Sequence, residues 1–579
     1  MKEKLEYNKY KKLMDDYEVK VNLIASFRLI VFVVMIFSFI LCNYYFEMFF
    51  KIVSIISFFM FILLIVIHEK YYRLYNYYVR YVEIISSYID RENGKWRTFS
   101  DTGEDLIDKK KSFLEDLDIL GNNSLYQYLS VCKTIGGRRN LLNKLSNIKF
   151  NNTKLREDQK AIEELVNNTS FDIEFQVSLA KYSGRNVDLS NSVENCSKNI
   201  SFKYIFLLIP IICFCLSFMS LYLGLIKVIS INYFYFVFIF NYLISFMYGY
   251  LFKEDFSLMD EIINSYGGLR DIFLVVVNRN FSSKKLNDIS NNMKSGMKAV
   301  GSIKRLEGMN SIRSNVLANF ISNGLSNYNV ILMYYFKCFL SDSIDDLMIG
   351  VRGVEELEGM ISVASMGIVL DNKCMPSISD KLEINVVNMK HPLFEQEKAV
   401  GNDFYTDFGV NIITGSNMGG KTSFLRTIGI NIILMNAGGY VCADSFSSCY
   451  LKIFTSMRIR DDLVNGISTF YGELLRIKDA INYIDKGNML VLIDEIFKGT
   501  NYQDRIYGAK EVIERLNIKN AICFITTHDF VLCDEKNVKN YYVKEYYEND
   551  EIKFDYKIRE GKCSSTNAKY LMKKIGIIR

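Results

Sequence analysis

The stretch ITGSNMGGKTSFLRTIG, residues 413–429, decides the fold class of the C-terminal part of the chain. It contains the pattern G-x-x-x-x-G-K-[ST], from Gly415 to Thr422. A short β-type run at residues 409–414 precedes the pattern, and a helical pattern follows it. A strand, a glycine-rich loop and a helix in this order are the context in which the pattern forms a phosphate-binding loop. The sequence therefore predicts an α/β domain that holds the phosphates of a nucleotide.

Each residue type in this loop has a chemical reason. The glycines let the backbone curl so that its N–H groups converge on phosphate oxygens, and the helix N-terminus adds a partial positive charge. Lys421 is placed to reach the β- and γ-phosphates, and the Thr422 hydroxyl to ligate Mg²⁺. The candidate nucleotide-binding residues are Gly415, Ser416, Asn417, Met418, Gly419, Gly420, Lys421, Thr422 and Ser423.

A second β-type run ends in two carboxylates suited to nucleotide hydrolysis. The apolar run at residues 489–493 is typical of a buried parallel strand, and Asp494 and Glu495 follow it. Because the C-terminal end of such a strand lies beside the phosphate loop, we expect Asp494 to hold Mg²⁺ together with Thr422. Glu495 is suited to orient and deprotonate the attacking water.

A third run, at residues 521–525, is followed by Thr526, Thr527 and His528. A histidine at the end of a parallel strand is a candidate sensor of the γ-phosphate, so His528 joins the catalytic candidates. The alternative is a capping or solvent-exposed histidine without a catalytic role.

The N-terminal half of the chain contains four uncharged, apolar runs, at residues 29–46, 52–67, 204–226 and 228–252. Runs of this length suit a bilayer core about 30 Å thick. The short polar breaks between them predict two helical hairpins that cross a membrane. Buried core helices are the alternative, and they are plausible by length only for residues 52–67.

Lysines predict the orientation of these hairpins. Residues 1–20 are rich in lysine, whereas the two hairpin turns carry one lysine each, Lys51 and Lys227. Positive charge stays on the cytoplasmic side. We therefore expect a multi-pass protein of the cell membrane with both termini and the nucleotide domain in the cytoplasm. No small-residue cleavage site follows the first apolar run, so a cleaved signal peptide is not expected.

Composition is consistent with this placement. The chain has 12 Cys and 3 His. The cysteines have no CxxC spacing, which favours reduced thiols and argues against a disulfide framework or a zinc site. The net charge of +5 is mild for 579 residues and decides nothing about DNA or anionic lipid. The basic stretches GGRR at 136–139 and SIKR at 302–305 are candidates for contact with DNA phosphates or, alternatively, solvated helix faces.

The predicted fold is an α/β P-loop ATPase domain with a mostly parallel sheet, preceded by an all-α region that carries the two hairpins and that, by the family resemblance described next, is similar to a core and lever region. The predicted segments are a basic arm at 1–22, a transmembrane hairpin at 23–67, helices at 68–202, a second hairpin at 203–252, helices at 253–381 and the ATPase domain at 382–579.

The C-terminal sequence resembles that of the MutS family of DNA mismatch-repair ATPases. The centre NMGG at 417–420 looks like that family's phosphate loop, and Ser416 stands where proline is more usual. The stretch ISTFYGEL at 467–474 looks like its Ser-Thr-Phe signature, and LIDEIFKGTN at 492–501 like its Asp-Glu segment, with Lys498 in place of arginine. TTHDF at 526–530 and residues 554–561 continue the match.

The resemblance implies a fold, cofactors and partners. It implies ATP and Mg²⁺, a homodimer, and a role for Ser468, which in the family reaches the nucleotide of the other subunit. It also implies DNA as a partner, with mismatched DNA as the family's substrate. Membrane runs occupy the end where the family's mismatch-reading domain is expected, and the triplet FLE at 113–115 stands without that domain.

Two other functions compete with DNA engagement. One is a membrane switch, in which ATP-driven dimer motion acts on a protein or lipid partner. The other is an ABC-like transporter, since the two ATPase families share a related nucleotide fold. Against the transporter, the sequence has no Leu-Ser-Gly-Gly-Gln signature and few charges inside the apolar runs.

Overall fold

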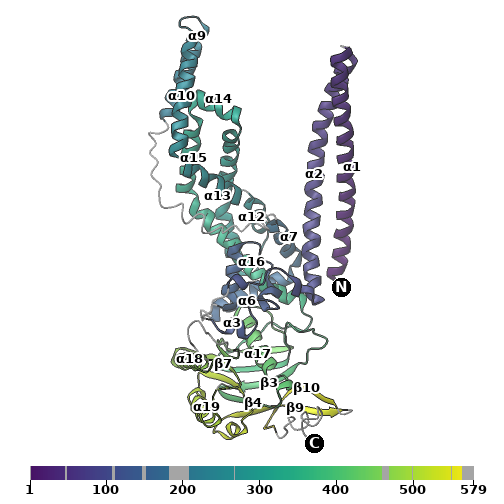
Figure 1. Ribbon diagram of the computed structural model, residues 1–579, viewed down its shortest axis with the longest axis vertical. Helices are drawn as coiled ribbons and strands as arrows, with labels where there is room; N and C mark the ends of the chain where they lie inside the picture. Colours follow the sequence, from purple (N-terminus) through teal and green to yellow (C-terminus); the bar gives the residue numbers. More distant parts are fainter. Residues whose placement is uncertain are drawn as a thin grey trace. The chain divides into compact units, whose positions relative to one another are not determined.

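The computed structural model describes residues 2–45, 48–106, 111–146, 152–180, 208–266, 268–458, 469–498, 500–548 and 551–563 (Figure 1). Contacts divide the chain into two compact units. The first contains residues 1–98 and 169–181, and the second contains residues 99–168 and 182–579.

The first unit is a long helical hairpin with a small base. Its elements are α1 (Lys2–Tyr45), α2 (Met48–Glu92), η1 (Lys95–Thr98) and α7 (Thr169–Leu179). Aromatic rings pair along the hairpin in antiparallel register: Tyr10 lies 3.9 Å from Tyr81, and Phe32 lies 5.4 Å from Phe61. The lysine-rich N-terminal arm is helical and continuous with the first apolar run. At the base, the Tyr88 hydroxyl donates to the buried Asp172 of α7 at 2.5 Å.

The second unit begins with helices. They are η2 (Glu104–Leu106), α3 (Phe113–Asp116), α4 (Leu125–Leu129), α5 (Ile135–Ser146), α6 (Asn152–Asn167), α9 (Leu208–Leu225), α10 (Asn232–Leu251), α11 (Lys253–Tyr266), α12 (Leu269–Val277), α13 (Lys284–Ser314), α14 (Val316–Ser326), α15 (Tyr328–Asp342) and α16 (Ile344–Val369). α16 is buried along most of its length and packs against α5, α6 and α13. It is the central helix of this region.

A buried carboxylate of α16 caps the N-terminus of α5. Glu358 accepts hydrogen bonds from the backbone N–H groups of Lys133 and Thr134, at 2.6 and 3.2 Å, and from the Thr134 hydroxyl. These donors satisfy the carboxylate, but no cation neutralises it within the described contacts. Burial raises the pKa of Glu358 to about 7.

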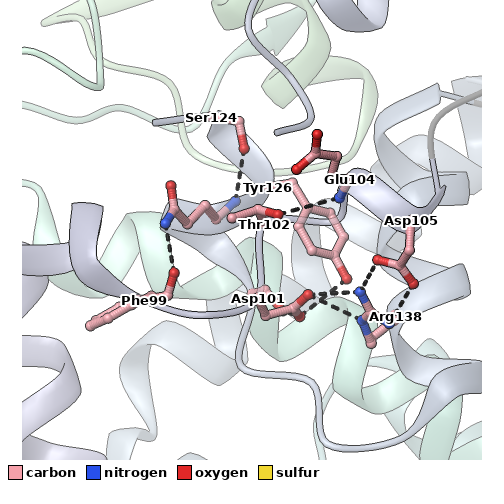
Figure 2. A network of polar contacts seen from close by, with 10 residues as sticks. Phe99, Asp101, Thr102, Glu104, Asp105, Ser124, Tyr126 and Arg138 are labelled. Atoms are coloured by element: carbon pink, nitrogen blue, oxygen red, sulfur yellow. Dashed lines mark hydrogen bonds and ion pairs between the residues drawn. The ribbon is translucent and has the colours of Figure 1, made fainter. Parts of the chain in front are cut away.

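The basic stretch at 136–139 lies in α5, and its first arginine is occupied by acidic partners (Figure 2). Arg138 pairs with Asp101 at 2.8 Å and with Asp105 at 2.6 Å. Asp101 also accepts from the Tyr126 hydroxyl at 3.4 Å. Arg138 therefore fixes the segment before α3, and this arrangement favours a structural role over contact with DNA phosphates.

Four helices are long and apolar enough to cross a membrane by length and composition: α1 and α2 in the first unit, and α9 and α10 in the second. Most of the side chains in their apolar windows are exposed. Residues 203–207, which we expected to open the second hairpin, lie outside the described residues.

The C-terminal domain contains two sheets (Figure 1). The larger has the strand order β10-β9-β4-β8-β7-β6, built from β4 (Gly409–Thr414), β6 (Lys452–Ser456), β7 (Met489–Asp494), β8 (Ala521–Thr526), β9 (Lys539–Glu548) and β10 (Glu551–Glu560). All its neighbours are parallel except the β9–β10 hairpin. This confirms the predicted α/β fold with a mostly parallel sheet.

The smaller sheet was not predicted. It has the order β1-β5-β2-β3 and consists of β1 (Ser377–Ile378), β2 (Glu383–Met389), β3 (Asn402–Asp407) and β5 (Ser445–Ser448). The helices and turns of the domain are η5 (Asn417–Gly419), α17 (Lys421–Asn436), α18 (Thr469–Ile481), η6 (Ile484–Lys486), α19 (Tyr502–Leu516) and η7 (Phe530–Asp534). Side chains of β4, β7, β8, α18 and α19 form one apolar core.

Candidate nucleotide site

The loop between β4 and α17 has the backbone shape that the motif predicts. β4 is buried along its whole length, and parallel neighbours flank it on both sides. Gly415 and Gly420 have φ angles of +131° and +90°, in the region that favours glycine. The loop thus turns sharply at both ends and delivers the chain into the first turn of α17.

Val543 of β9 lies directly against this loop. A Cβ built on Gly415 would lie 2.7 Å from the Val543 carbonyl oxygen, and one on Gly419 would lie 2.5 Å from the Val543 side chain. Residues with side chains would therefore push the loop off the sheet. The glycines serve this close approach as well as the curl of the loop.

Lys421 opens α17 and is 2% exposed. Its ammonium group donates to the carbonyl oxygen of Gly415 at 2.6 Å, across the loop. Burial lowers the pKa of Lys421, while the nearby Glu495 and Asp494 act in the opposite direction. A phosphate group at the loop would add negative charge beside this buried cation.

Thr422, Asp494 and Thr526 form a chain of hydrogen bonds at the ends of three elements. The Thr422 hydroxyl donates to Asp494 Oδ2 at 2.8 Å, and the Thr526 hydroxyl donates to Asp494 Oδ1 at 2.6 Å. Asp494 and Thr526 are register partners on β7 and β8. The donor set is entirely oxygen, which fits Mg²⁺. The structure therefore brings the two predicted magnesium ligands, Thr422 and Asp494, together.

Glu495 follows in a strained turn. It has a φ of +57°, and its backbone N–H donates to the Thr526 hydroxyl at 2.9 Å. Its carboxylate lies 2.9 Å from Lys498 Nζ. Burial tends to raise the pKa of Glu495, but the hydrogen bond and charge of Lys498 outweigh it and hold the pKa below its ordinary value. Glu495 is therefore an ionised carboxylate, the form that a general base requires.

His528 lies on the other side of this carboxylate, with Nε2 3.5 Å from Glu495 Oε1. Burial, followed by the charge of Lys421, lowers the pKa of His528. The imidazole is thus neutral near pH 7 and can hold a single proton toward Glu495 or a phosphate oxygen. The His528 side chain lies beside Glu495 and is also 47% exposed to solvent, and its catalytic role stays a prediction.

The remaining predicted residues divide into three groups. Met418 is 66% exposed, and Ser423 is exposed on the first turn of α17. Ser416 begins the η5 turn, and among the described contacts its buried hydroxyl has no hydrogen-bond partner. Ser468 and the Asn417 side chain lie outside the described residues, as does the segment 564–579.

Sequence reasoning missed Glu473, although it lies inside the Ser-Thr-Phe signature. This side chain is 4% exposed and accepts from the backbone N–H of Phe497 at 2.7 Å. Phe497 has a φ of +56°. Glu473 therefore holds the turn that presents Glu495. The sequence did contain a signal, because Glu473 shares a helical face with the apolar Ile477 and Ala480.

It also missed a second carboxylate, Asp116 of α3, which is fully buried. Asp116 accepts from the Thr455 hydroxyl at 2.7 Å, from the backbone N–H of Met457 and Arg458 at 3.2 and 3.1 Å, and from Arg476 at 3.0 Å. Arg458 and Arg476 flank the segment that contains Ser468. Asp116 thus ties both flanks of that segment to the helical region.

Asp118 adds a link to the phosphate-loop helix. Its carboxylate pairs with Arg426 of α17 at 2.9 Å and with Arg458 at 2.6 Å. We call the five residues Asp116, Asp118, Arg426, Arg458 and Arg476 the arginine junction. It joins α3 to α17, to the end of β6 and to α18.

Comparison with known proteins gives the same assignment to this part of the chain. Residues 411–577 match the family described as MutS domain V. The chain is similar to a DNA mismatch repair protein MutS of Lactobacillus johnsonii, 37% identical over 196 residues, which are 32% of this chain and 23% of that protein. It is also similar to a MutS protein of Alkaliphilus metalliredigens, 31% identical over 239 residues (39% of this chain and 27% of that protein).

A third relative is an endonuclease MutS2 of Clostridioides difficile, 29% identical over 232 residues, which are 38% of this chain and 28% of that protein. The chain spans about a quarter of the length of these curated relatives. The similarity to each relative covers well under half of this chain.

Proposed function

We propose, on the premise that this chain belongs to the MutS family through its C-terminal domain, that it hydrolyses ATP with Mg²⁺ at the loop of residues 415–422. The observation that carries the proposal is the convergence of Lys421, Thr422, Asp494 and Glu495 at the C-terminal ends of β4 and β7. The four groups come from segments more than 70 positions apart, and each has the chemistry its place requires.

The residues would divide the work as follows. Backbone N–H groups of the loop and Lys421 bind the phosphates, and Thr422 and Asp494 hold Mg²⁺, which neutralises charge on the phosphate oxygens. Glu495 would accept a proton from the water whose oxygen forms a bond to the γ-phosphorus, while the bond from that phosphorus to the β–γ bridging oxygen breaks and ADP leaves. His528 orients Glu495 and senses the γ-phosphate oxygens.

Two substitutions test this division in the full chain, purified in detergent. Lys421→Ala should abolish tight ATP binding, whereas Glu495→Gln should keep binding and stall hydrolysis. Lys510→Ala is a matched control, because Lys510 lies on α19 and pairs with Glu535 away from the loop. Hydrolysis at the wild-type rate by Glu495→Gln would remove Glu495 as the general base.

Hydrolysis also requires a homodimer in this proposal, with Ser468 of one subunit serving the nucleotide of the other. The support is the resemblance of residues 467–474 to the family signature and the attachment of both flanks of that segment to Asp116. Inactive Ser468→Ala and Lys421→Ala subunits, mixed together, should restore one working site per heterodimer. Turnover that stays linear in protein concentration down to a demonstrated monomer would contradict the shared site.

The protein is, in this proposal, an integral protein of the cell membrane with its ATPase domain in the cytoplasm. Four apolar helices with exposed side chains support it. Carbonate extraction should leave the protein in the membrane. A cysteine at Lys227 should react with an impermeant maleimide in intact cells, and one at the exposed Tyr507 of α19 should not. Cys563 is a poor reporter because it is buried.

DNA is the partner we propose, because relatives of this domain are named as DNA mismatch repair proteins. The competing function is an ATP-driven membrane switch that acts on a protein or lipid, and the four apolar helices favour it. Binding of mismatched, branched and plain duplexes by the detergent-solubilised protein, measured across a salt series, separates the two. Absence of binding to all three at low salt would favour the switch.

A further inference from the structure

α14 presents an apolar face that no described part of the chain covers. Val316, Leu317, Phe320 and Ile321 are 81%, 73%, 45% and 53% exposed. A contiguous set of large exposed apolar side chains marks a surface that binds something other than water. The stretch that contains them has no charged residue from Ser314 to Phe336.

One edge of this face, at the half-exposed Phe320, and the neighbouring Gly324 pack against the middle of α10. The Phe320 ring lies 5.2 Å from Phe238 and 5.1 Å from Tyr242. Phe238 also fills the space beside Gly324, where a Cβ would lie 2.2 Å from the ring. The buried Asn241 donates to the Gly324 carbonyl oxygen at 3.1 Å. α14 is therefore fastened to a helix that we propose crosses the membrane.

Ion pairs mark where this region meets water. Lys337 of α15 pairs with Asp255 at 2.5 Å, just beyond the end of α10, and Arg313 of α13 pairs with Asp260 at 2.5 Å. Lys337 follows Asn327, which joins α14 to α15, by ten positions. At 1.5 Å per residue this is about 15 Å, or about half of a 30 Å hydrocarbon core.

The Asn323 side chain of α14 is buried against the protein. The Ser245 hydroxyl donates to Asn323 Oδ1 at 2.6 Å, and the backbone N–H of Asn329 donates to the same oxygen at 2.9 Å. Asn327 is fully buried, and its N–H donates to the Asn323 carbonyl oxygen at 3.1 Å. Irregular backbone at membrane depth is tolerated only where protein covers it, and this turn meets that condition.

We propose that α14 and the first half of α15 form a re-entrant pair that enters the cytoplasmic half of the bilayer beside α9 and α10, with the four apolar side chains of α14 against lipid acyl chains. The proposal rests on membrane insertion of the α9–α10 hairpin. A bilayer is favoured over a protein partner because exposed apolar residues of α10, Phe240, Leu243 and Phe246 among them, continue the same kind of surface.

The single tryptophan of the chain makes a direct test available. Trp96 is buried and lies outside the apolar runs. In a Trp96→Phe background, one new tryptophan is placed at Leu317 or Ile321 of α14. Two references carry it at Phe246 of α10, 71% exposed, and at Tyr507 of α19, 70% exposed. The full-length variants are reconstituted in vesicles of phosphatidylcholine with or without bromine on the acyl chains, and tryptophan emission is compared.

Bromine in the acyl region should lower the emission of Leu317→Trp, Ile321→Trp and Phe246→Trp at least about twofold, because these side chains lie in the hydrocarbon. Tyr507→Trp should be unaffected. Quenching at 246 without quenching at 317 and 321 would overturn the re-entrant pair, leave the hairpin intact and point to a protein partner for α14. No quenching at any position would overturn the proposed membrane insertion itself, and the re-entrant pair with it.

Discussion

Two carboxylates of the second unit, the buried Asp116 and the half-buried Asp494, have opposite surroundings, although both accept hydrogen bonds at the C-terminal ends of parallel strands. Asp116, at the end of β6, is saturated by two backbone N–H groups, a hydroxyl and the Arg476 guanidinium. Asp494, at the end of β7, has two threonine hydroxyls and, within the described ion pairs, no cationic partner. A carboxylate that already pairs with an arginine has a structural role. One that accepts only from hydroxyl groups is suited to bind a cation that enters together with the nucleotide.

The largest expected effect tests the metal side of this comparison. Asp494→Asn should reduce Mg²⁺-dependent ATP hydrolysis about 100-fold or more, since an amide cannot neutralise the ion. Thermal unfolding without nucleotide should change little, because no described cation loses its partner. The measurement is steady-state hydrolysis across a Mg²⁺ series, with melting followed in parallel. A variant that hydrolyses ATP normally, or that melts far below the wild type, would show that Asp494 has a structural role like that of Asp116 and does not bind the metal.

The next effect concerns the structural ion pair between Asp116 and Arg476. Asp116→Asn leaves the Arg476 guanidinium without its buried partner and should lower the free energy of unfolding by about 3 kcal/mol. Asp118→Asn is the matched control in the same junction. Its carboxylate is about one-third exposed, and the loss should be about 1 kcal/mol or less. Urea unfolding of both variants gives the two values, and equal losses would contradict the difference we draw between them.

Glu358 is a third carboxylate that extends this comparison. It accepts hydrogen bonds from backbone and hydroxyl donors, and within the described contacts it has no cationic partner. Its pKa is raised to about 7 by burial, so the native state binds a proton more tightly than the unfolded chain. This contribution to stability is complete below about pH 4.5 and is lost as the pH rises to about 7, a change of about 3 kcal/mol. Glu358→Gln keeps a side-chain carbonyl oxygen as an acceptor but does not titrate. It should therefore make the free energy of unfolding less dependent on pH between about 4.5 and 7. A curve unchanged in slope would mean that Glu358 does not titrate there.

The smallest effect concerns Lys498, which stands where the family's arginine is expected. Its exposed ammonium lowers the pKa of Glu495. Without it the pKa rises, so less of the base is ionised at low pH. Lys498→Ala should therefore reduce hydrolysis about two- to threefold near pH 5 and leave it unchanged at pH 8. Lys498→Arg should behave as the wild type. A uniform loss at all pH values would indicate a contact with the nucleotide instead.

The phosphate site could be predicted because its information is local. Gly415 to Thr422 is one short motif, and Asp494 ends an unmistakable buried strand. The site's hydroxyl link through Thr526 was not predicted, since it depends on the lateral register of β7 and β8. Asp116 lies more than 300 positions before the residues it binds, and no periodicity in either segment encodes that pairing.

α14 escaped sequence reasoning for a different reason. Its asparagines at 319 and 323 recur every four residues, which on a soluble helix would mark the water-facing side. In the structure Asn323 is buried and bonded to Ser245, Asn319 is half-buried beside it, and the apolar residues are exposed. Compared with a helix of a soluble protein, the polar and apolar faces are therefore exchanged. Hydropathy averaged along the chain does not detect which face is polar.

The cap that Glu358 places on α5 has a consequence for synthesis. Thr134 leaves the ribosome 224 positions before Glu358, since 358 − 134 = 224. At about 5–20 residues per second this interval lasts roughly 11–45 s, during which α5 has neither its cap nor the helix it packs against. The chain made during this interval includes the apolar helices of residues 208–251. Slowing translation between residues 140 and 350 should therefore lengthen, in proportion, the time in which α5 has no cap.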